Sequence, residues 1–406
     1  MALLSKKFTL LYISPDKFPP FRVDITELFG HRLVESGHRI DWLLQSKEEL
    51  KSSYLTSWHG GRAWVGKADL RGSPQSRFKK HIFALLHDLK LFRLCKKNKY
   101  DFVQVKDKFL CVFPAILACK LFDSKFIYWL SFPIPEASIA SAKEKTARYP
   151  IYNFIRGRVF HFILYRVVSR YADYIFVQSE AMKQDLALKG IPNNKMMSIP
   201  MGVSSELLRN EVEEDLKIEE KSIVYLGELG KARRLDFVVD VFAEILKVIP
   251  SAKLYFIGGS SNLNDSEDLK KYCMSLGVEK NTIFTGFLPR DEALEYVKKS
   301  SVCLSPLLPS PIFDVASPTK LIEYMALGKA VVANDHPEQR TVIEQSKGGI
   351  CVPYNVLSFS EAVIYLLKNP CEAKKMGSSG RRYVLETREY GVISKRLEES
   401  YLQFCK

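Results

Sequence analysis

The feature of this sequence that most constrains its fold is a repeated alternation of short apolar runs with helix-like stretches. In the first half, apolar runs predict strands at 8–14, 39–44, 101–105, 125–131 and 174–178. In the second half, they predict strands at 222–226, 253–257, 282–285, 301–304, 330–334 and 349–352. Helical periodicity fills the intervals. Strands that alternate with helices predict parallel sheets covered on both faces.

Two such series predict two Rossmann-like, doubly wound α/β domains. We expect an N-terminal domain at 1–200, a second domain at 201–385, and a C-terminal helix at 386–406 that packs back toward the N-terminal domain. The segment 198–222 separates the two series, because its second half is acidic and has no strand pattern. Ligands of this fold class bind at the carboxyl ends of the strands, so we expect a site in a cleft between the domains.

Charge is distributed unevenly along the 406 residues. Residues 1–200 hold 33 Lys and Arg against 17 Asp and Glu, whereas the rest of the chain is close to neutral. The imbalance indicates an anionic partner for the first half, although solubility alone would also account for it. Two basic stretches, 77–99 and 156–171, have helical periodicity. The first suits either an anionic membrane surface or an ordinary domain helix, whereas the nearly continuous apolar surface of the second predicts burial.

Other sequence features narrow the class of protein. The eight cysteines are scattered, with no C-x-x-C pair and no zinc-like spacing, which is typical of a reduced, cytosolic protein. The run KKFTLLYIS is too short for a signal peptide and predicts a first strand. No apolar stretch is long enough to predict a membrane-spanning helix. No G-x-G-x-x-G follows the first strand, which disfavours a NAD-dependent dehydrogenase.

The stretch SPTKLIEYMALGKAVVAND, residues 317–335, carries the most specific polar pattern. Ser317 is a good helix N-cap, Pro318 suits the first helical position, and Gly328 follows the expected helix end. Lys320 and Glu323 then share one face of the helix with Thr319. A helix N-terminus with a nearby cation suits phosphate, and a carboxylate one turn later suits ribose hydroxyls. A simple surface ion pair between Lys320 and Glu323 would also explain the spacing.

This stretch resembles the nucleotide-binding signature of the GT4 family of retaining glycosyltransferases, which have the GT-B fold of two Rossmann-like domains. The resemblance extends to ADYIFVQSEAMKQDLALKGIPNNKMMSIPMGV, IVYLGELGKARRLDFVVDVF, LYFIGGS, TIFTGFLPRDEALEYVKKSSVCLSP and GGICVP, in the order that the family has them. It also includes LVESGHRIDWLL near the N-terminus, so it spans nearly the whole chain and is strongest after residue 170.

The resemblance implies specific roles for individual residues. Glu323 would bind the ribose of the donor, and Leu288 would line the base. The backbone of Ser317, Pro318 and Thr319 would face the diphosphate and the sugar. The remaining candidates for the donor side are Gly227, Lys231, Arg233, Asp314 and Lys320, of which Arg233, Lys320 and Asp314 are the catalytic candidates.

The sequence departs from the family pattern at several of these places. Val315 stands where the family often has a glutamate, with Asp314 beside it, and Glu228 stands where it has an arginine. In the first domain, Arg22 lies within FPPFRVD in place of a glycine pair, and Ser131 replaces a histidine. Arg22 and Ser131 are therefore the candidates for the acceptor and phosphate side of the cleft.

The resulting hypothesis is transfer of a sugar from a UDP- or GDP-linked donor to a glycan or polyprenyl-diphosphate-linked acceptor, in surface polysaccharide or glycolipid synthesis. No D-x-D motif occurs, so we expect no metal and no cofactor. The basic first half predicts peripheral attachment to an anionic membrane at its cytoplasmic face, and no nucleic-acid partner. A GT-B-type sugar-nucleotide epimerase, a catalytically degenerate partner protein and a nucleic-acid-binding protein stay open as alternatives.

Overall fold

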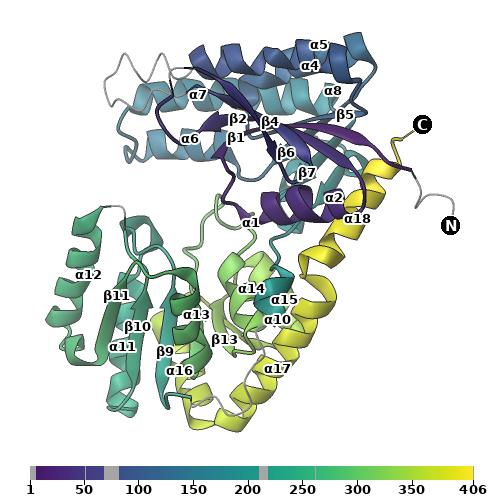
Figure 1. The fold of residues 1–406 in the computed structure, drawn as a ribbon. Coiled ribbons are helices and arrows are strands. Elements are labelled where there is room, and N and C mark those ends of the chain that lie inside the picture. Colours follow the sequence, from purple (N-terminus) through teal and green to yellow (C-terminus); the bar gives the residue numbers. More distant parts are fainter. Residues whose placement is uncertain (1–5, 51, 68–81, 210–217, 261, 406) are drawn as a thin grey trace. The chain divides into compact units, whose positions relative to one another are not determined.

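The computed structural model describes residues 6–50, 52–67, 82–209, 218–260 and 262–405 (Figure 1). Contacts between residues divide the chain into two compact units. Unit 1 comprises Met1–Pro200 together with Tyr390–Lys406, and unit 2 comprises Met201–Glu389. Each unit has its own sheet, and each sheet is predominantly or wholly parallel. The expected fold class, two Rossmann-like α/β domains, is therefore confirmed.

Unit 1 is built on an eight-stranded sheet with the order β3-β4-β2-β1-β5-β6-β7-β8. All neighbouring strands are parallel except β3 and β4, which form an antiparallel pair. The strands are β1 (Thr9–Phe18), β2 (Arg39–Ser46), β3 (Tyr54–Trp58), β4 (Gly61–Gly66), β5 (Phe102–Lys106), β6 (Lys125–Leu130), β7 (Tyr174–Val177) and β8 (Met196–Ser198).

Helices connect these strands. After β1 one continuous helical segment comprises α1 (Val23–Ile25), η2 (Thr26–Arg32) and α2 (Leu33–Glu35). The others are α4 (Lys90–Asn98), η3 (Phe109–Cys111), α5 (Val112–Phe122), α6 (Ile134–Lys143), α7 (Pro150–Phe162), η4 (Ile163–Val168), α8 (Ser169–Tyr171), α9 (Glu180–Leu188), η5 (Asn193–Lys195) and α18 (Tyr390–Leu402). Residues 82–88 are also helical.

Helix α18 is part of the core of unit 1, although it lies at the end of the chain. Its buried side chains include Ile393, Leu397 and Tyr401, and they pack in one cluster with residues of β1, β2 and β5. The Tyr401 hydroxyl donates a hydrogen bond to the Gln104 side chain on β5. His38 Nε2 lies 2.7 Å from Glu398 Oε1, which fixes the other side of the helix to the start of β2.

The sequence did not predict the hairpin of β3 and β4. Its strands are joined by a tight turn at His59 and Gly60, both with positive φ. Strand β3 is largely exposed, so its side chains do not show the apolar alternation that marks a half-buried strand. The hairpin extends the sheet beyond β2 through parallel pairing of β4 with β2.

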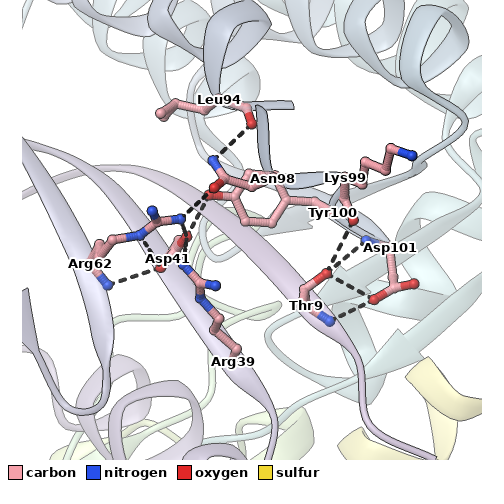
Figure 2. Close-up of polar contacts among 9 residues, drawn as sticks. All are labelled: Thr9, Arg39, Asp41, Arg62, Leu94, Asn98, Lys99, Tyr100 and Asp101. Carbon is pink, nitrogen blue, oxygen red and sulfur yellow. Dashed lines mark hydrogen bonds and ion pairs between the residues drawn. The ribbon is translucent and has the colours of Figure 1, made fainter. Parts of the chain in front are cut away.

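A buried carboxylate joins several of these elements (Figure 2). Asp41 on β2 accepts hydrogen bonds from the Arg62 backbone N–H at 2.9 Å, from Arg62 Nη2 at 2.7 Å and from the Tyr100 hydroxyl at 2.5 Å. Arg62 Nη2 also donates to Asn98 Oδ1 at the end of α4, at 2.8 Å. Burial raises the pKa of Asp41, but the bonds from Arg62 and Tyr100 outweigh it and hold the pKa below its usual value.

Unit 2 is built on a six-stranded parallel sheet with the order β11-β10-β9-β12-β13-β14. The strands are β9 (Ser222–Leu226), β10 (Lys253–Ile257), β11 (Thr282–Gly286), β12 (Val302–Ser305), β13 (Val331–Asn334) and β14 (Gly349–Val352). The strand order reverses between β9 and β12, and such a switch point is where ligands of this fold bind. All six strands were predicted to within a residue or two.

Helices cover both faces of this sheet (Figure 1). They are α10 (Ser205–Arg209), η6 (Lys231–Arg233), α11 (Asp236–Val248), α12 (Leu263–Ser275), η7 (Glu279–Asn281), α13 (Arg290–Lys299), α14 (Thr319–Ala326), α15 (Pro337–Ser346), α16 (Val356–Lys368) and α17 (Pro370–Thr387). One core cluster lies between the sheet and α11 and α16, and another lies between the sheet and α13 and α14.

Of the two basic stretches, only the second differs from its expected environment. Residues 77–81 lie outside the described residues, and from residue 82 the first stretch is helical, with Leu85, Leu86 and Leu89 exposed. The expected burial of 156–171 is wrong for one side of the segment. Val159 is 45% exposed and Phe162 is 59% exposed, because only the opposite side of this helix packs on unit 1.

Candidate functional site

The start of α14 differs from the prediction. The helix begins at Thr319, Pro318 occupies the N-cap position, and no side chain caps the first turn. The Ser317 hydroxyl instead donates to Glu338 Oε1 at 2.7 Å and accepts from the Met201 backbone N–H at 2.9 Å. Arg388 Nη1 donates to the same Glu338 oxygen. Ser317 therefore anchors the approach to α14 and leaves the first N–H groups of the helix without a side-chain cap.

Lys320, in the first turn of α14, lies against the end of β9. Its Nζ donates to the Tyr225 hydroxyl at 2.5 Å and lies 3.8 Å from the centre of the Tyr225 ring. A Cβ at Gly227 would lie 2.7 Å from Lys320 Cε, so any larger residue at that position would displace the end of the lysine side chain. Burial, and then repulsion from Arg233, lower the pKa of Lys320 to about 7. The charges of Glu323 and Glu228 offset this only in part, and no ion pair joins Lys320 to a carboxylate among the residues that the structure describes.

Glu323 lies one turn after Lys320 and borders a pocket of about 320 Å³. The pocket is lined by Leu226, Gly227, Glu228, Ile257, Gly258, Phe287, Leu288, Arg290, Ala293, Leu294 and Glu323. The Glu323 side chain is 21% exposed, and its Oε1 lies 3.5 Å from Arg290 Nη2. Burial raises the pKa of Glu323, and the charges of Arg290 and Lys320 oppose that rise. The predicted neighbours Glu323, Leu288 and Gly227 do line one pocket.

Backbone turns at the carboxyl ends of β9, β10 and β11 form the floor of this pocket. The Gly227 N–H donates to the Ile257 carbonyl at 2.8 Å, and the Gly258 N–H donates to the Gly286 carbonyl at 3.1 Å. Gly258 has φ +122°, and a Cβ there would lie 2.2 Å from the Gly227 carbonyl oxygen. Only glycine allows the turns to approach so closely, and this exposes backbone to an incoming ligand.

Two further cations lie in the loop after β9. Arg233 is half-buried in the short helix η6, and its Nη2 lies 3.8 Å from Glu228 Oε2. Lys231 is exposed, and its backbone N–H donates to Asp265 Oδ2 at 3.1 Å. The positive charge of Arg233 contributes to the lowered pKa of Lys320. Glu228, which departs from the family pattern, is therefore the present partner of Arg233.

Asp314 and Val315 belong to a separate turn. The Asp314 carboxylate accepts from the Ser310 N–H at 3.4 Å, and its own N–H donates to the Ser310 carbonyl. Val315 is 7% exposed. The carboxylate of Asp314 thus closes its own turn, and the structure does not place it with the residues that line the pocket.

Sequence reasoning missed Tyr225 and Arg290. Tyr225 occupies an apolar strand, where a buried aromatic is ordinary, and only the fold brings its hydroxyl to Lys320. Arg290 begins α13 directly after the run TGFLP, and its position one residue after a proline could have marked it as a side chain at the pocket edge. Both contacts join segments far apart in the sequence.

The two candidates of unit 1 lie in partly buried polar surroundings at the carboxyl ends of β1, β5 and β6. Arg22 Nη2 lies 2.8 Å from Asp24 Oδ2, and Lys106 Nζ lies 3.6 Å from the same oxygen. Ser131 donates from its backbone N–H, at 2.9 Å, and from its hydroxyl to Asp107. Burial raises the pKa of Asp107, although Lys106 and Ser131 oppose the rise. The sequence did not single out Asp24, Lys106 or Asp107.

A larger cavity of about 1100 Å³ lies elsewhere in unit 2. Its lining includes Lys221, Ser251, Ser301 and Ala330, which lie one or two residues before the strands β9, β10, β12 and β13. It therefore lies at the amino-terminal edge of the sheet, opposite to the edge where α/β folds bind nucleotides. Among the residues that the structure describes, no group of three or more His, Cys, Asp or Glu is placed to hold a metal ion.

Comparison with known proteins assigns both units. Residues 26–207 match the profile of Glycosyltransferase Family 4, and residues 209–383 match that of Glycosyl transferases group 1. A Haemophilus influenzae protein described as an uncharacterized glycosyltransferase is 26% identical over 330 residues, which cover 79% of this chain and 80% of that protein.

Two further comparisons, one of sequence and one of structure, also give similar proteins. A Mycolicibacterium smegmatis GDP-mannose-dependent alpha-(1-6)-phosphatidylinositol monomannoside mannosyltransferase is 24% identical over 246 residues, covering 58% of this chain and 63% of that enzyme. The structure of a sucrose-phosphate synthase from Thermosynechococcus elongatus superposes with a TM-score of 0.75 at 17% identity, covering 97% and 98% of the two chains.

The two profiles follow one another along the chain in the same order as the two α/β units, and the pocket lies at the carboxyl ends of the second sheet. The chain therefore belongs to the GT4 family of glycosyltransferases, enzymes of the GT-B fold that use nucleotide-sugar donors.

Proposed function

We propose that this chain transfers a sugar, with retention of anomeric configuration, from a UDP- or GDP-linked donor to a lipid-linked glycan acceptor. The single observation that supports the donor site best is Lys320. It lies in the first turn of α14 over Gly227, with its pKa lowered to about 7 and Glu323 one turn away. A diphosphate would supply the missing counter-charge, and Glu323 would accept hydrogen bonds from the two ribose hydroxyls.

The pocket supports this placement of the donor. Phe287 is 74% exposed and lies with Leu288 at the pocket edge, where an aromatic and an aliphatic surface suit the faces of a nucleobase. The base would therefore lie against these two residues, the ribose at Glu323, and the diphosphate between Lys320 and the exposed glycine backbone at Gly227. The volume of the pocket, about 320 Å³, is at the lower end of the range for small-molecule pockets.

In the proposed reaction, the bond between the anomeric carbon and the diphosphate oxygen breaks as the acceptor oxygen bonds to the same carbon. Lys320, Arg233 and Lys231 would stabilise the negative charge that develops on the departing diphosphate. The acceptor hydroxyl would give its proton to an oxygen of that diphosphate. The fixed cations of unit 2 would thereby stabilise the charge of the departing diphosphate, which other transferases stabilise with a metal ion. We propose that this enzyme needs no metal ion.

The acceptor is proposed from charge and from the relatives. Unit 1 carries the excess of Lys and Arg, and its polar cluster of Arg22, Lys106 and Ser131 lies at the carboxyl ends of its strands. The mycobacterial relative is named for a phosphatidylinositol acceptor. No helix among the described residues combines the length and the hydropathy needed to cross a bilayer. We therefore place this enzyme at the periphery of an anionic membrane, on its cytoplasmic side.

The donor assignment is tested by thermal unfolding with UDP, GDP, ADP and their common sugar conjugates. One nucleotide at about 100 times its Kd should stabilise the wild type by about 2.7 kcal/mol, which raises the Tm of a unit of this size by roughly 5–11 °C. Glu323→Ala should lose that shift. Glu267→Ala, at an exposed pair with Lys270 on α12, should keep it. No shift with any nucleotide would contradict the proposal, and conversion of the donor sugar without an acceptor would indicate an epimerase.

A further inference from the structure

The helices α5 and α7 of unit 1 expose an unusual amount of apolar surface. Leu110 in η3 and Phe113, Leu117 and Leu121 in α5 recur at helical spacing, and these side chains are 49–61% exposed. In α7, Ile151, Ile155, Val159 and Phe162 form a second stripe that is 45–79% exposed. A soluble protein rarely exposes contiguous apolar surface of this kind unless a partner covers it. We refer to these eight side chains as the α5–α7 face.

The two stripes lie on neighbouring helical segments. The Phe109 and Phe160 rings stack with their centres 4.5 Å apart, and Lys120 Nζ lies 4.8 Å from the centre of the Tyr171 ring. Both contacts join residues that are 51 positions apart, so α5 runs parallel to the continuous helical segment formed by α7, η4 and α8. Helix α4 packs against α5 as well, as Figure 1 shows. With that offset, Leu110 lies at the level of Phe162, so the two stripes meet end to end on neighbouring helices.

Positive charge surrounds this surface. Residues 145–172 contain six Lys and Arg and no Asp or Glu. Arg158, Arg166 and Arg170 are exposed along the helical segment, and Lys120 is the only charged residue of α5. On α4, the exposed side chains include Arg93, Lys96 and Lys97. An apolar strip with basic residues at its sides is the pattern of a protein surface that lies in the headgroup region of an anionic bilayer.

Charge also decides against a second copy of the chain as the occupant. A twofold symmetric dimer through this face would bring the same basic residues of two copies together, without acidic residues from 145–172 to pair with them. Such like-charge contacts disfavour association. A nucleic acid would match the arginines but not the eight exposed apolar side chains.

We propose that the α5–α7 face is the surface by which this enzyme docks on anionic membranes. The apolar side chains enter the headgroup region, and the surrounding arginines and lysines contact lipid phosphates. This inference rests on the proposed membrane association and assigns it to particular residues. It places the apolar part of the membrane contact on α5 and α7, and α4, which is the last part of the basic stretch 77–99, supplies some of the positive charge beside it.

The proposal is tested by flotation with vesicles of phosphatidylglycerol and phosphatidylethanolamine, and with phosphatidylcholine vesicles for comparison, at low salt. The double variant Ile155→Glu/Phe162→Glu should reduce co-flotation with the anionic vesicles about tenfold or more. The matched control is Met274→Glu/Leu357→Glu, whose two parent residues are 63% and 64% exposed on unit 2. It should float like the wild type.

A second pair of variants tests the charge. Arg158→Gln/Arg166→Gln should weaken binding to anionic vesicles, because each surface cation contributes to the attraction, whereas Lys374→Gln/Lys375→Gln on α17 should not. Nucleotide-dependent thermal shifts report on unit 2, and all of these variants should retain them. This separates failure of the docking proposal from failure of the donor assignment.

Three results would overturn the assignment. The wild type could fail to float with anionic vesicles, or the α5–α7 variants could float as well as it does. Sedimentation could instead show a wild-type dimer that Ile155→Glu/Phe162→Glu dissociates, which would make the face an interface between copies of this chain.

Discussion

Lys320 combines a first-turn helix position with burial and with a neighbouring arginine, and all three disfavour its charged form in the ligand-free protein. A bound diphosphate would reverse this, because it brings negative charge to the same place. The pKa of Lys320 should therefore rise from about 7 when the donor binds. Binding then takes up a proton at any pH between the two pKa values.

It follows that affinity for the nucleotide should fall as pH rises above 7, by up to tenfold per pH unit. The phosphate groups of the ligand contribute little there, since their second ionisation lies near pH 6. Titration calorimetry at several values between pH 7 and pH 9 measures this slope. In Lys320→Met, binding should be weaker and nearly independent of pH. Equal slopes for the two proteins would show that another group takes up the proton.

At the level of elements, the buried carboxylate of Asp41 holds β2, β4 and the end of α4 together. Its folded-state pKa is depressed, so it adds stability above the ordinary Asp pKa and loses that contribution as pH falls through the folded-state value. Asp41→Asn should therefore destabilise unit 1 by about 3 kcal/mol at pH 7, because it leaves Arg62 without its anionic partner.

Urea denaturation followed by tryptophan fluorescence measures this difference for unit 1 alone. All four tryptophans of the chain, at 42, 58, 64 and 129, belong to that unit. The gap between wild type and Asp41→Asn should narrow below about pH 4. Asp185→Asn, at a partly exposed pair with Lys189, should change stability by less than about 0.5 kcal/mol. A gap that persists unchanged at low pH would assign the effect to packing.

The individual elements also show which parts of the structure could be predicted from the sequence alone. The strands of unit 2 were predictable because each is a short apolar run. The family resemblance then named Glu323, Leu288 and Gly227, which line one pocket. Ser317 misled the prediction, because its hydroxyl binds Glu338, a partner 21 residues away, and does not cap α14. The surface of α7 misled it too, because apolar residues all round a helix usually mean a protein interior. The partner of the Ser317 hydroxyl and the exposure of α7 both depend on tertiary contacts, which local sequence patterns do not reveal.

At the level of the whole molecule, unit 1 depends on the last residues of the chain. Tyr401 is 1% exposed, packs on Phe8, Phe102 and Phe176, and bonds to Gln104. Tyr401→Ala should destabilise unit 1 by about 3–5 kcal/mol, which is typical for removing a large buried side chain. The tryptophan-fluorescence transition should move to lower urea, whereas nucleotide binding by unit 2 under native conditions should persist.

The control is Leu357→Ala, at an exposed position, which should leave the tryptophan-fluorescence transition in place. An unchanged transition in Tyr401→Ala would contradict the role of α18.

The return of the chain from unit 2 to unit 1 at Tyr390 also has a consequence for biosynthesis. A ribosome completes the eight strands of the first sheet long before it reaches α18, because residues 201–389 intervene. At roughly 5–20 residues per second, that interval lasts on the order of 10–40 s. Throughout it, the apolar surface that α18 will cover stays open. The first unit to be translated is therefore the last to close its core, and a message truncated before the codons of α18 would yield a chain that never does.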